Sequence, residues 1–253
     1  MGPHGRTLGR RHAFLPLLLW LVFATYPSPV AASVSPTSDD AAFPVVLATY
    51  TTTLIGSFPA RTDNIRLAAR ALDGITLEPG EVLSFNTAVG PRTVERGYQQ
   101  APVILHEMRD VQIGGGVCQV ASTLLDASLL AGLAVVERHR HSFAVDYVPP
   151  AHDATIVWGA KDLRVVNALD QRVRIRATVL GSTLTARIEG EEGPRETFEL
   201  EAAVIESPAR ARADDQGRQI ELYRIRRMDG EEVDRELIHR DVYPPALARS
   251  PRR

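Results

Sequence analysis

Disulfide bonds within the chain are excluded, because the 253-residue sequence contains one cysteine, Cys118. A membrane-spanning run is not evident either: the apolar run near the N-terminus has about a dozen residues, short of the roughly 20 that cross a bilayer as a helix. A large positive charge is also missing, since 29 basic residues face 31 acidic ones. We therefore expect no nucleic-acid partner. The 44% hydrophobic content is that of an ordinary globular protein.

The N-terminus has the pattern of a secretory signal peptide over residues 1–32. Three arginines precede the apolar run, and the small-residue sequence VAAS follows it. We expect cleavage near Ala32, which would change the formal net charge from −2 to about −5. The alternative is an uncleaved membrane anchor. The pattern predicts an exported protein of the periplasm or extracellular cell envelope, with no stable membrane span in the mature chain.

The mature chain is predicted to contain one α+β core domain over residues 45–190, after a small, polar linker at 33–44. A helix is indicated at 61–75 by its apolar period, with Thr62 or Asp63 as its N-cap. Short β-rich segments separated by turn signals follow from Ser142 to Gly190. Helices early and strands late favour the α+β class, with a Cys-bearing helix packed on an antiparallel sheet.

Residues 191–253 are predicted to form a small C-terminal β extension and tail. A charged break after Gly190 leads into two strand-like stretches. Asp229 and Gly230 lie within the second stretch, and this pair is a strong signal for a hairpin turn. The last residues, from Tyr243 onward, are rich in proline and arginine, and we expect a frayed tail there.

The cysteine occupies a reactive type of position. Gly114, Gly115 and Gly116 precede Cys118 with Val117 between them, and apolar residues at helical spacing continue as far as Gly132. Cys118 should therefore lie in the first turn of a helix, where free N–H groups and the helix dipole favour a thiolate. The same N–H groups, with those of Gly116 or Gln119, could form an oxyanion hole.

A base and an orienting group are available downstream. Strand-like alternation places His139 and His141 on one face, and Asp153 begins the next β-rich segment. A helix with cysteine, a strand with histidine and a strand with aspartate follow one another in papain-type and transglutaminase-like folds. By that analogy Cys118 is a nucleophile, His141 its base and Asp153 the group that orients the imidazole.

Two other interpretations use the same residues. Cys118 could be an unreactive core residue, since a lone cysteine often packs as a small apolar side chain. Alternatively, His139 and His141 with Cys118 or Asp153 could bind zinc. The nucleophile interpretation is the one we carry forward, with neither a metal nor another cofactor.

Seven stretches between about Val45 and Gly190 follow a recognisable order: TDNIRLAA, LEPGEVLSFNTAVGPRT, GYQQAPVI, GGGVCQVASTLLDASLLAGLAVVERHRHS, DYVPPAHDATI, DLRVVN and VRIRATV. In these stretches the sequence resembles the VanW family. The resemblance implies a bacterial protein of the cell envelope associated with glycopeptide resistance. It also implies that the family motif includes Gly115, Gly116, Cys118, Gln119, Ser122, Thr123, His139, His141, Tyr147 and Asp153.

The sequence departs from the family pattern at two places. Ala121 stands where serine is common, and Ala151 and His152 stand where the family usually has Gly-Arg before Asp153. If that arginine binds a substrate carboxylate, we expect this protein to recognise the carboxylate more weakly, or only at low pH.

The functional hypothesis is cysteine-dependent acyl hydrolysis or transfer on peptidoglycan or muropeptides. The alternative is a non-catalytic module that binds peptidoglycan or a glycopeptide. Catalysis is assigned to Cys118, His141 and Asp153. Substrate-binding or oxyanion roles are assigned to Gly115, Gly116, Gln119, Ser122, His139 and Tyr147.

Overall fold

The computed structural model describes residues 41–105, 108–194, 196–205 and 218–243. All of them lie in the second of the two compact units of the chain, residues 36–253. The predicted signal peptide and most of the predicted linker lie outside the described residues. Among the residues that are described, no helix is long and apolar enough to cross a membrane.

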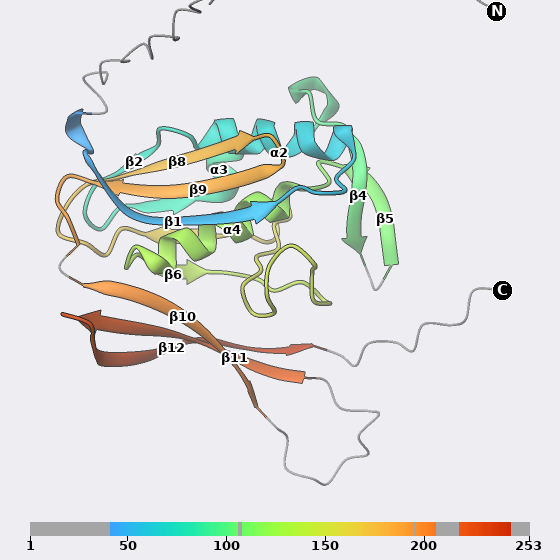
Figure 1. Ribbon diagram of the computed structural model, residues 1–253. Helices are drawn as coiled ribbons and strands as arrows, with labels where there is room; N and C mark the ends of the chain where they lie inside the picture. The colour runs from blue at the N-terminus through green and yellow to red at the C-terminus, as the bar shows by residue number, and fades with distance from the viewer. Residues whose placement is uncertain (1–40, 106–107, 195, 206–217, 244–253) are drawn as a thin grey trace, which may run out of the picture. The chain divides into compact units, whose positions relative to one another are not determined.

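A four-stranded antiparallel sheet forms the base of the core (Figure 1). Its inner face is apolar because buried side chains alternate with polar ones along the strands, as Ile175 and Ala177 do with Arg174 and Arg176. In spatial order its strands are β1 (Val45–Thr53), β9 (Thr183–Gly190), β8 (Val173–Leu180) and β2 (Thr76–Leu77).

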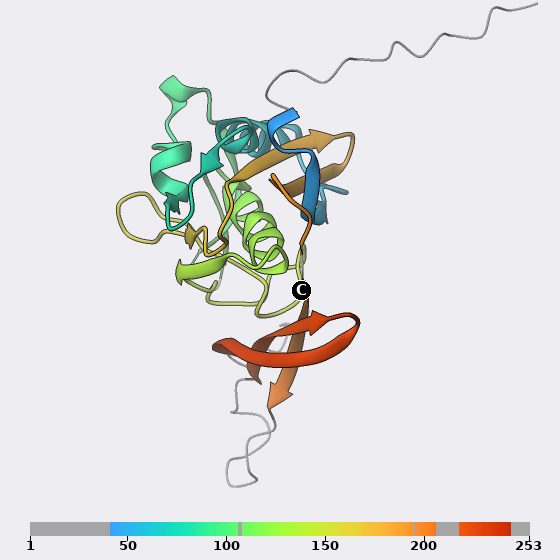
Figure 2. The same ribbon diagram turned by 90° about the vertical axis from the view of Figure 1, so that its left-hand side faces the viewer.

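Two helices, α2 (Pro59–Leu72) and α4 (Val117–Leu130), cover the same face of this sheet (Figure 2). Helix α2 contacts β8, and α4 contacts β1, β9 and α2. Helix α4 is buried on almost every side: all its residues except Cys118 and Leu130 are buried. This burial explains why α4 has no solvent-facing charged side, and its polar residues, such as Gln119 and Ser122, are buried with the rest.

Three smaller sheets complete the described chain. The outer strands of the core are arranged as β3-β7-β6, and a separate hairpin pairs β4 with β5. The C-terminal sheet has the order β10-β11-β12, and β10 contacts α4. The bounds of these elements are β3 (Val82–Ser84), α3 (Phe85–Val89), η1 (Val94–Arg96), β4 (Gln100–Leu105), β5 (Met108–Ile113), β6 (Ala134–Glu137), β7 (Arg164–Val166), β10 (Thr197–Ile205), β11 (Arg218–Met228) and β12 (Glu231–Tyr243).

The fold is thus mixed α and β, with mostly antiparallel sheets and few helices, in agreement with the coarse prediction. The predicted hairpin is present: Asp229 and Gly230 join β11 to β12, both with positive φ, as a tight two-residue turn requires. The predicted start of α2 is wrong. The helix begins at Pro59 and not after Thr62 or Asp63, because the fixed φ of proline suits the first helical position.

The segment with the histidines is not the predicted pair of strands. Residues 138–163 are irregular apart from one isolated bridge between Val157 and Lys161. One reason is that side chains occupy backbone groups that a strand would need: the carboxylate of Asp153 accepts the N–H of His141 over 2.6 Å. The helix–strand–strand order of the papain-type analogy is therefore not confirmed.

The glycine turn before α4 is packed directly against β4. A Cβ atom added to Gly115 would lie 2.4 Å from the carbonyl oxygen of Ala101 and 2.8 Å from that of Pro102. Both are backbone atoms, so a side chain at Gly115 would require the strand to move.

We predict that Gly115→Ala lowers the free energy of unfolding by about 1–3 kcal/mol through this overlap. Gly193→Ala is the matched control, because a Cβ there meets nothing within 4 Å and neither glycine has positive φ. Urea unfolding of both variants measures the difference. Equal stabilities would show that the contact with β4 is not tight.

Candidate functional site

Cys118 is the second residue of α4, and its sulfur faces the irregular segment that follows β6. The backbone N–H of Ile156 donates to Sγ over 3.5 Å. The residue is partly exposed, whereas its neighbours Val117 and Gln119 are buried. The thiol is therefore held at a fixed place, in a residue of α4 that is not fully buried.

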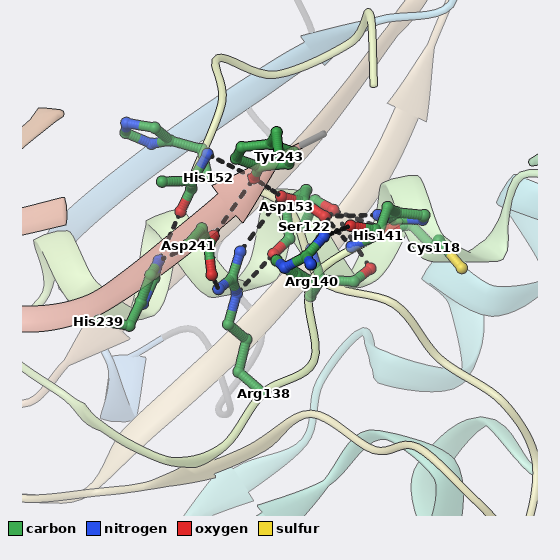
Figure 3. Close-up of polar contacts among 12 residues, drawn as sticks. Cys118, Ser122, Arg138, Arg140, His141, His152, Asp153, His239, Asp241 and Tyr243 are labelled. Carbon is green, nitrogen blue, oxygen red and sulfur yellow. Dashed lines mark hydrogen bonds and ion pairs between the residues drawn. The ribbon is translucent and has the colours of Figure 1, made fainter. Parts of the chain in front are cut away.

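The structure brings Cys118, His141 and Asp153 together (Figure 3). Nδ1 of His141 lies 2.6 Å from Oδ2 of Asp153. The imidazole also lies close enough to the Cys118 thiol to lower the pKa of the thiol. The three groups thus follow the order thiol, imidazole, carboxylate, in which an imidazole can activate a thiol.

The carboxylate of Asp153 accepts four hydrogen bonds and is almost completely buried. Oδ2 accepts the backbone N–H and the ring N–H of His141. Oδ1 accepts from Nη2 of Arg138 over 3.2 Å and from the hydroxyl of Tyr243 over 2.7 Å. Arg138 also pairs with Asp241, with Nη1 and Oδ1 2.8 Å apart.

Tyr243 corrects the prediction of a frayed tail that starts at this residue. It is the last residue of β12 and is buried, because its hydroxyl is held between Asp153 and the N–H of Ala151. His239, Asp241 and Tyr243 alternate along β12 and all contact the core of the site. That alternation of polar residues was the available sequence signal, and it was missed.

The electrostatics of the three residues favour a charged thiol–imidazole pair. Burial raises the pKa of Asp153, but the His141 hydrogen bond and the Arg138 charge lower it to about 2. Burial lowers the pKa of His141, but hydrogen bonds with Asp153 and Cys118 raise it to about 9. Burial raises the pKa of Cys118, but the His141 hydrogen bond and charge outweigh this effect, and the pKa falls below its usual value.

Gln119 and Ser122 do not line an open cleft, contrary to their predicted roles. Both side chains are completely buried. The amide of Gln119 donates to Thr52 Oγ1 and to the Thr53 carbonyl of β1, over 2.9 and 3.0 Å. The hydroxyl of Ser122 donates to the Cys118 carbonyl and accepts the N–H of Ala154, each over 2.9 Å. Both groups position their neighbours.

Tyr147 lies beside the imidazole, with its ring edge-on to His141 at a centroid distance of 6.5 Å. Its phenolic oxygen is buried and has no hydrogen-bond partner among the described residues. Burial, and then the nearby charge of Cys118, raise the pKa of Tyr147 well above its usual value. The phenol therefore stays protonated.

His139 is placed differently from His141. Its Nε2 lies 3.1 Å from Oε1 of Glu137, and its side chain is partly exposed. Among the residues that the structure describes, no group of three or more potential ligands could hold a metal ion. The contact of His139 with Glu137 is a side-chain hydrogen bond.

Gly115 and Gly116 act through packing. The carbonyl of Gly115 accepts from the side-chain amide of Asn64 over 3.0 Å, and that of Gly116 accepts the N–H of Gln119 over 3.0 Å. Gly116 has a φ of 106°, which favours glycine over other residues. The N–H of Gln119 is thus already paired, and the predicted oxyanion role does not fit it.

Two arginines near the thiol were also missed by the sequence analysis. The charge of Arg92 lowers the pKa of Cys118, and Arg61 interacts electrostatically with the same thiol. Neither residue is near Cys118 in sequence, so only the fold reveals them.

A family model described as VanW like protein matches residues 60–189, about half of the chain. The chain belongs to the VanW family. The match includes Cys118, His141 and Asp153, and it ends before the C-terminal sheet. The contacts of Tyr243 and Asp241 with the site therefore come from outside the VanW match.

Two curated relatives each match about half of this chain. One, from Bacillus subtilis strain 168, is named uncharacterized protein YoaR and is 43% identical over 138 residues, covering 54% of this chain and 46% of that protein. The other is the vancomycin B-type resistance protein VanW of Enterococcus faecalis, 26% identical over 142 residues, with coverage of 54% and 52%. The chain thus spans about half the length of these relatives. No solved structure matches it.

We predict that Asp153→Asn destabilises the fold more at about pH 6 than at about pH 10. The folded pKa of His141, about 9, lies above its usual 6.5. The charged imidazole therefore stabilises the fold below about pH 6.5, and this contribution is lost as the pH rises through about 9. Urea unfolding at the two pH values tests the sign. Asp146→Asn, an exposed carboxylate of the same segment, should show no such dependence.

A second prediction concerns the C-terminal sheet. Tyr243→Phe removes the hydroxyl between Asp153 and Ala151 and should lower the free energy of unfolding by about 1–2 kcal/mol. Tyr223→Phe is the control, since that hydroxyl donates to Glu221 on the same sheet, away from Asp153. Thermal unfolding of both variants is the measurement. A larger loss for Tyr223→Phe would contradict the coupling between β12 and the site.

Proposed function

We propose that the chain is an exported cysteine-dependent acyl hydrolase or acyl transferase. The observation that carries the proposal is the 2.6 Å contact between His141 Nδ1 and Asp153 Oδ2, with the imidazole close enough to Cys118 to lower the pKa of its thiol. A histidine whose ring is oriented by a buried carboxylate activates a neighbouring thiol. The lowered pKa of Cys118 supports the same role.

The reaction follows from the geometry. The Cys118 thiolate attacks the carbonyl carbon of an amide, and a C–S bond forms. The tetrahedral intermediate collapses as the C–N bond breaks, and the leaving amine takes the proton held by His141. Water, or an acceptor amine, then gives a proton to His141 and attacks the thioester. The C–S bond then breaks, which releases the acid or a new amide and restores the Cys118 thiolate and the protonated His141.

The negative oxygen of the intermediate needs hydrogen-bond donors. The N–H of Cys118 lies in the first turn of α4, where backbone donors have no partner within the helix. The hydroxyl of Tyr147 is the second donor in this proposal, because it is protonated, buried and without a partner among the described residues. It replaces Gln119, whose amide is bonded to β1.

Peptidoglycan peptides are the proposed substrate class. Support comes from the signal-peptide pattern at residues 1–32 and from a relative whose name associates it with vancomycin resistance. The resemblance to an envelope-associated family agrees with this substrate. An unreactive Cys118 would instead support the alternative of a peptidoglycan-binding module.

We predict that Cys118→Ser reduces the release of peptide fragments from purified sacculi by about 10³-fold or more, with little change in stability. His141→Gln should reduce the release to a similar degree, and it should also destabilise the fold because Asp153 loses its imidazole partner. His139→Gln is the matched control and should retain most of the activity, because His139 pairs with Glu137 and not with Asp153. Mass spectrometry of the released fragments measures the effect. Undiminished release by Cys118→Ser would remove the nucleophile from the mechanism.

A further inference from the structure

Arg61 and Arg92 are half-buried cations that have no carboxylate partner among the described residues. Arg61 donates to Gln119 Oε1 over 2.8 Å and weakly to Ser57. Arg92 donates to Asn86 Oδ1 over 2.8 Å and to the Gly90 carbonyl over 2.9 Å. A guanidinium has five N–H donors, so these contacts leave several unused.

Both arginines are seated on the glycine turn that leads into Cys118. A Cβ on Gly116 would lie 2.9 Å from Cγ of Arg61, and a Cβ on Gly114 would lie 2.8 Å from Cβ of Arg92. Glycine at these two positions therefore makes room for the arginine stems. The turn thus holds two cations beside the first residues of α4.

Aromatic rings fix the two guanidinium groups next to residues of the site. The Arg61 guanidinium lies over the Tyr147 ring at 5.9 Å, and Tyr147 contacts His141. The Arg92 guanidinium lies over the Trp158 ring at 5.8 Å. Trp158 is two residues after Ile156, whose backbone N–H donates to the Cys118 thiol. About half of the Trp158 side chain is exposed. A partly open site with an exposed aromatic ring and oriented cations is typical of ligand recognition.

Other arginines of the described chain that are buried or half-buried have carboxylate partners, unlike Arg61 and Arg92. Arg138, Arg174 and Arg224 each pair with a carboxylate in the protein. Burial without such a partner costs free energy, which an anionic ligand would recover on binding. Burial also lowers the pKa of both Arg61 and Arg92, and the charges of Cys118 and of Asp146 (near Arg61) or Asp162 (near Arg92) offset this effect only in part.

We propose that Arg61 and Arg92 form a subsite for a carboxylate of the substrate, close to the carbonyl that Cys118 attacks. This inference rests on the proposed function and names its substrate class: acyl compounds with a free carboxylate near the scissile bond, such as peptides with a free acidic group. A guanidinium presents paired donors that match the two oxygens of a carboxylate.

The test compares the alkylation of Cys118 by iodoacetate, an anion, and by iodoacetamide, its neutral analogue. The ratio of the two rates cancels changes in thiol pKa, because both reagents need the thiolate. In the folded protein we expect the ratio to exceed that of the urea-unfolded protein by about 5- to 10-fold, through local attraction of the anion. Added salt should lower the ratio.

Arg61→Gln and Arg92→Gln should each bring the ratio toward the unfolded value, whereas Arg61→Lys and Arg92→Lys should keep much of it. The matched controls are Arg70→Gln and Arg96→Gln, exposed arginines on α2 and on η1 after Arg92. These two should leave the ratio unchanged. A ratio in the folded wild type equal to that of the unfolded chain, or unaffected by both Gln substitutions, would overturn the subsite.

The ratio of the two alkylation rates does not depend on whether the protein turns over a substrate. A raised ratio that depends on the two arginines supports the subsite even if Cys118→Ser shows that catalysis does not use the thiol. An active enzyme with a ratio at the unfolded value would overturn the subsite and leave the proposed reaction intact.

Discussion

The buried carboxylate of Asp153 is the interaction on which the site depends. A carboxylate removed from water is costly unless its oxygens are fully hydrogen-bonded, and here four donors from His141, Arg138 and Tyr243 satisfy it. These donors come from the irregular segment after β6 and from the end of β12. One charged group therefore fixes the imidazole, orders a segment without regular secondary structure and attaches the C-terminal sheet to the core.

Helix α4 supplies the other fixed point. Because it lies against the main sheet and also contacts β10, it cannot rotate without exposing apolar side chains. Its second residue, Cys118, is one of the few that remain partly accessible. Ser122, one turn further on, bonds to the N–H of Ala154, the residue next to Asp153. The hydrogen bond between Ser122 and Ala154 thus ties helix α4, which carries Cys118, to the segment that carries Asp153.

The sequence was informative where local chemistry decides the structure. Three glycines followed by an apolar helical period located Cys118 at a helix start, and Asp229-Gly230 located a hairpin. It was misleading around His141, since alternating residues resemble a strand when side-chain hydrogen bonds to the backbone are not visible. Arg61, Arg92 and Arg138 could not be found in this way, because only tertiary packing brings them to the site.

The position before Asp153 shows how the neighbourhood of the thiol differs from the family pattern. His152 stands where the resemblance leads us to expect arginine, but its Nδ1 lies 3.1 Å from both oxygens of the buried Asp126. An imidazole occupied in this way has no free charge to offer a substrate. If the substrate carries a carboxylate, its recognition therefore falls to cations outside this position. Arg61 and Arg92, which lack carboxylate partners among the described residues and lie against the glycine turn, have the charge and the location for that role.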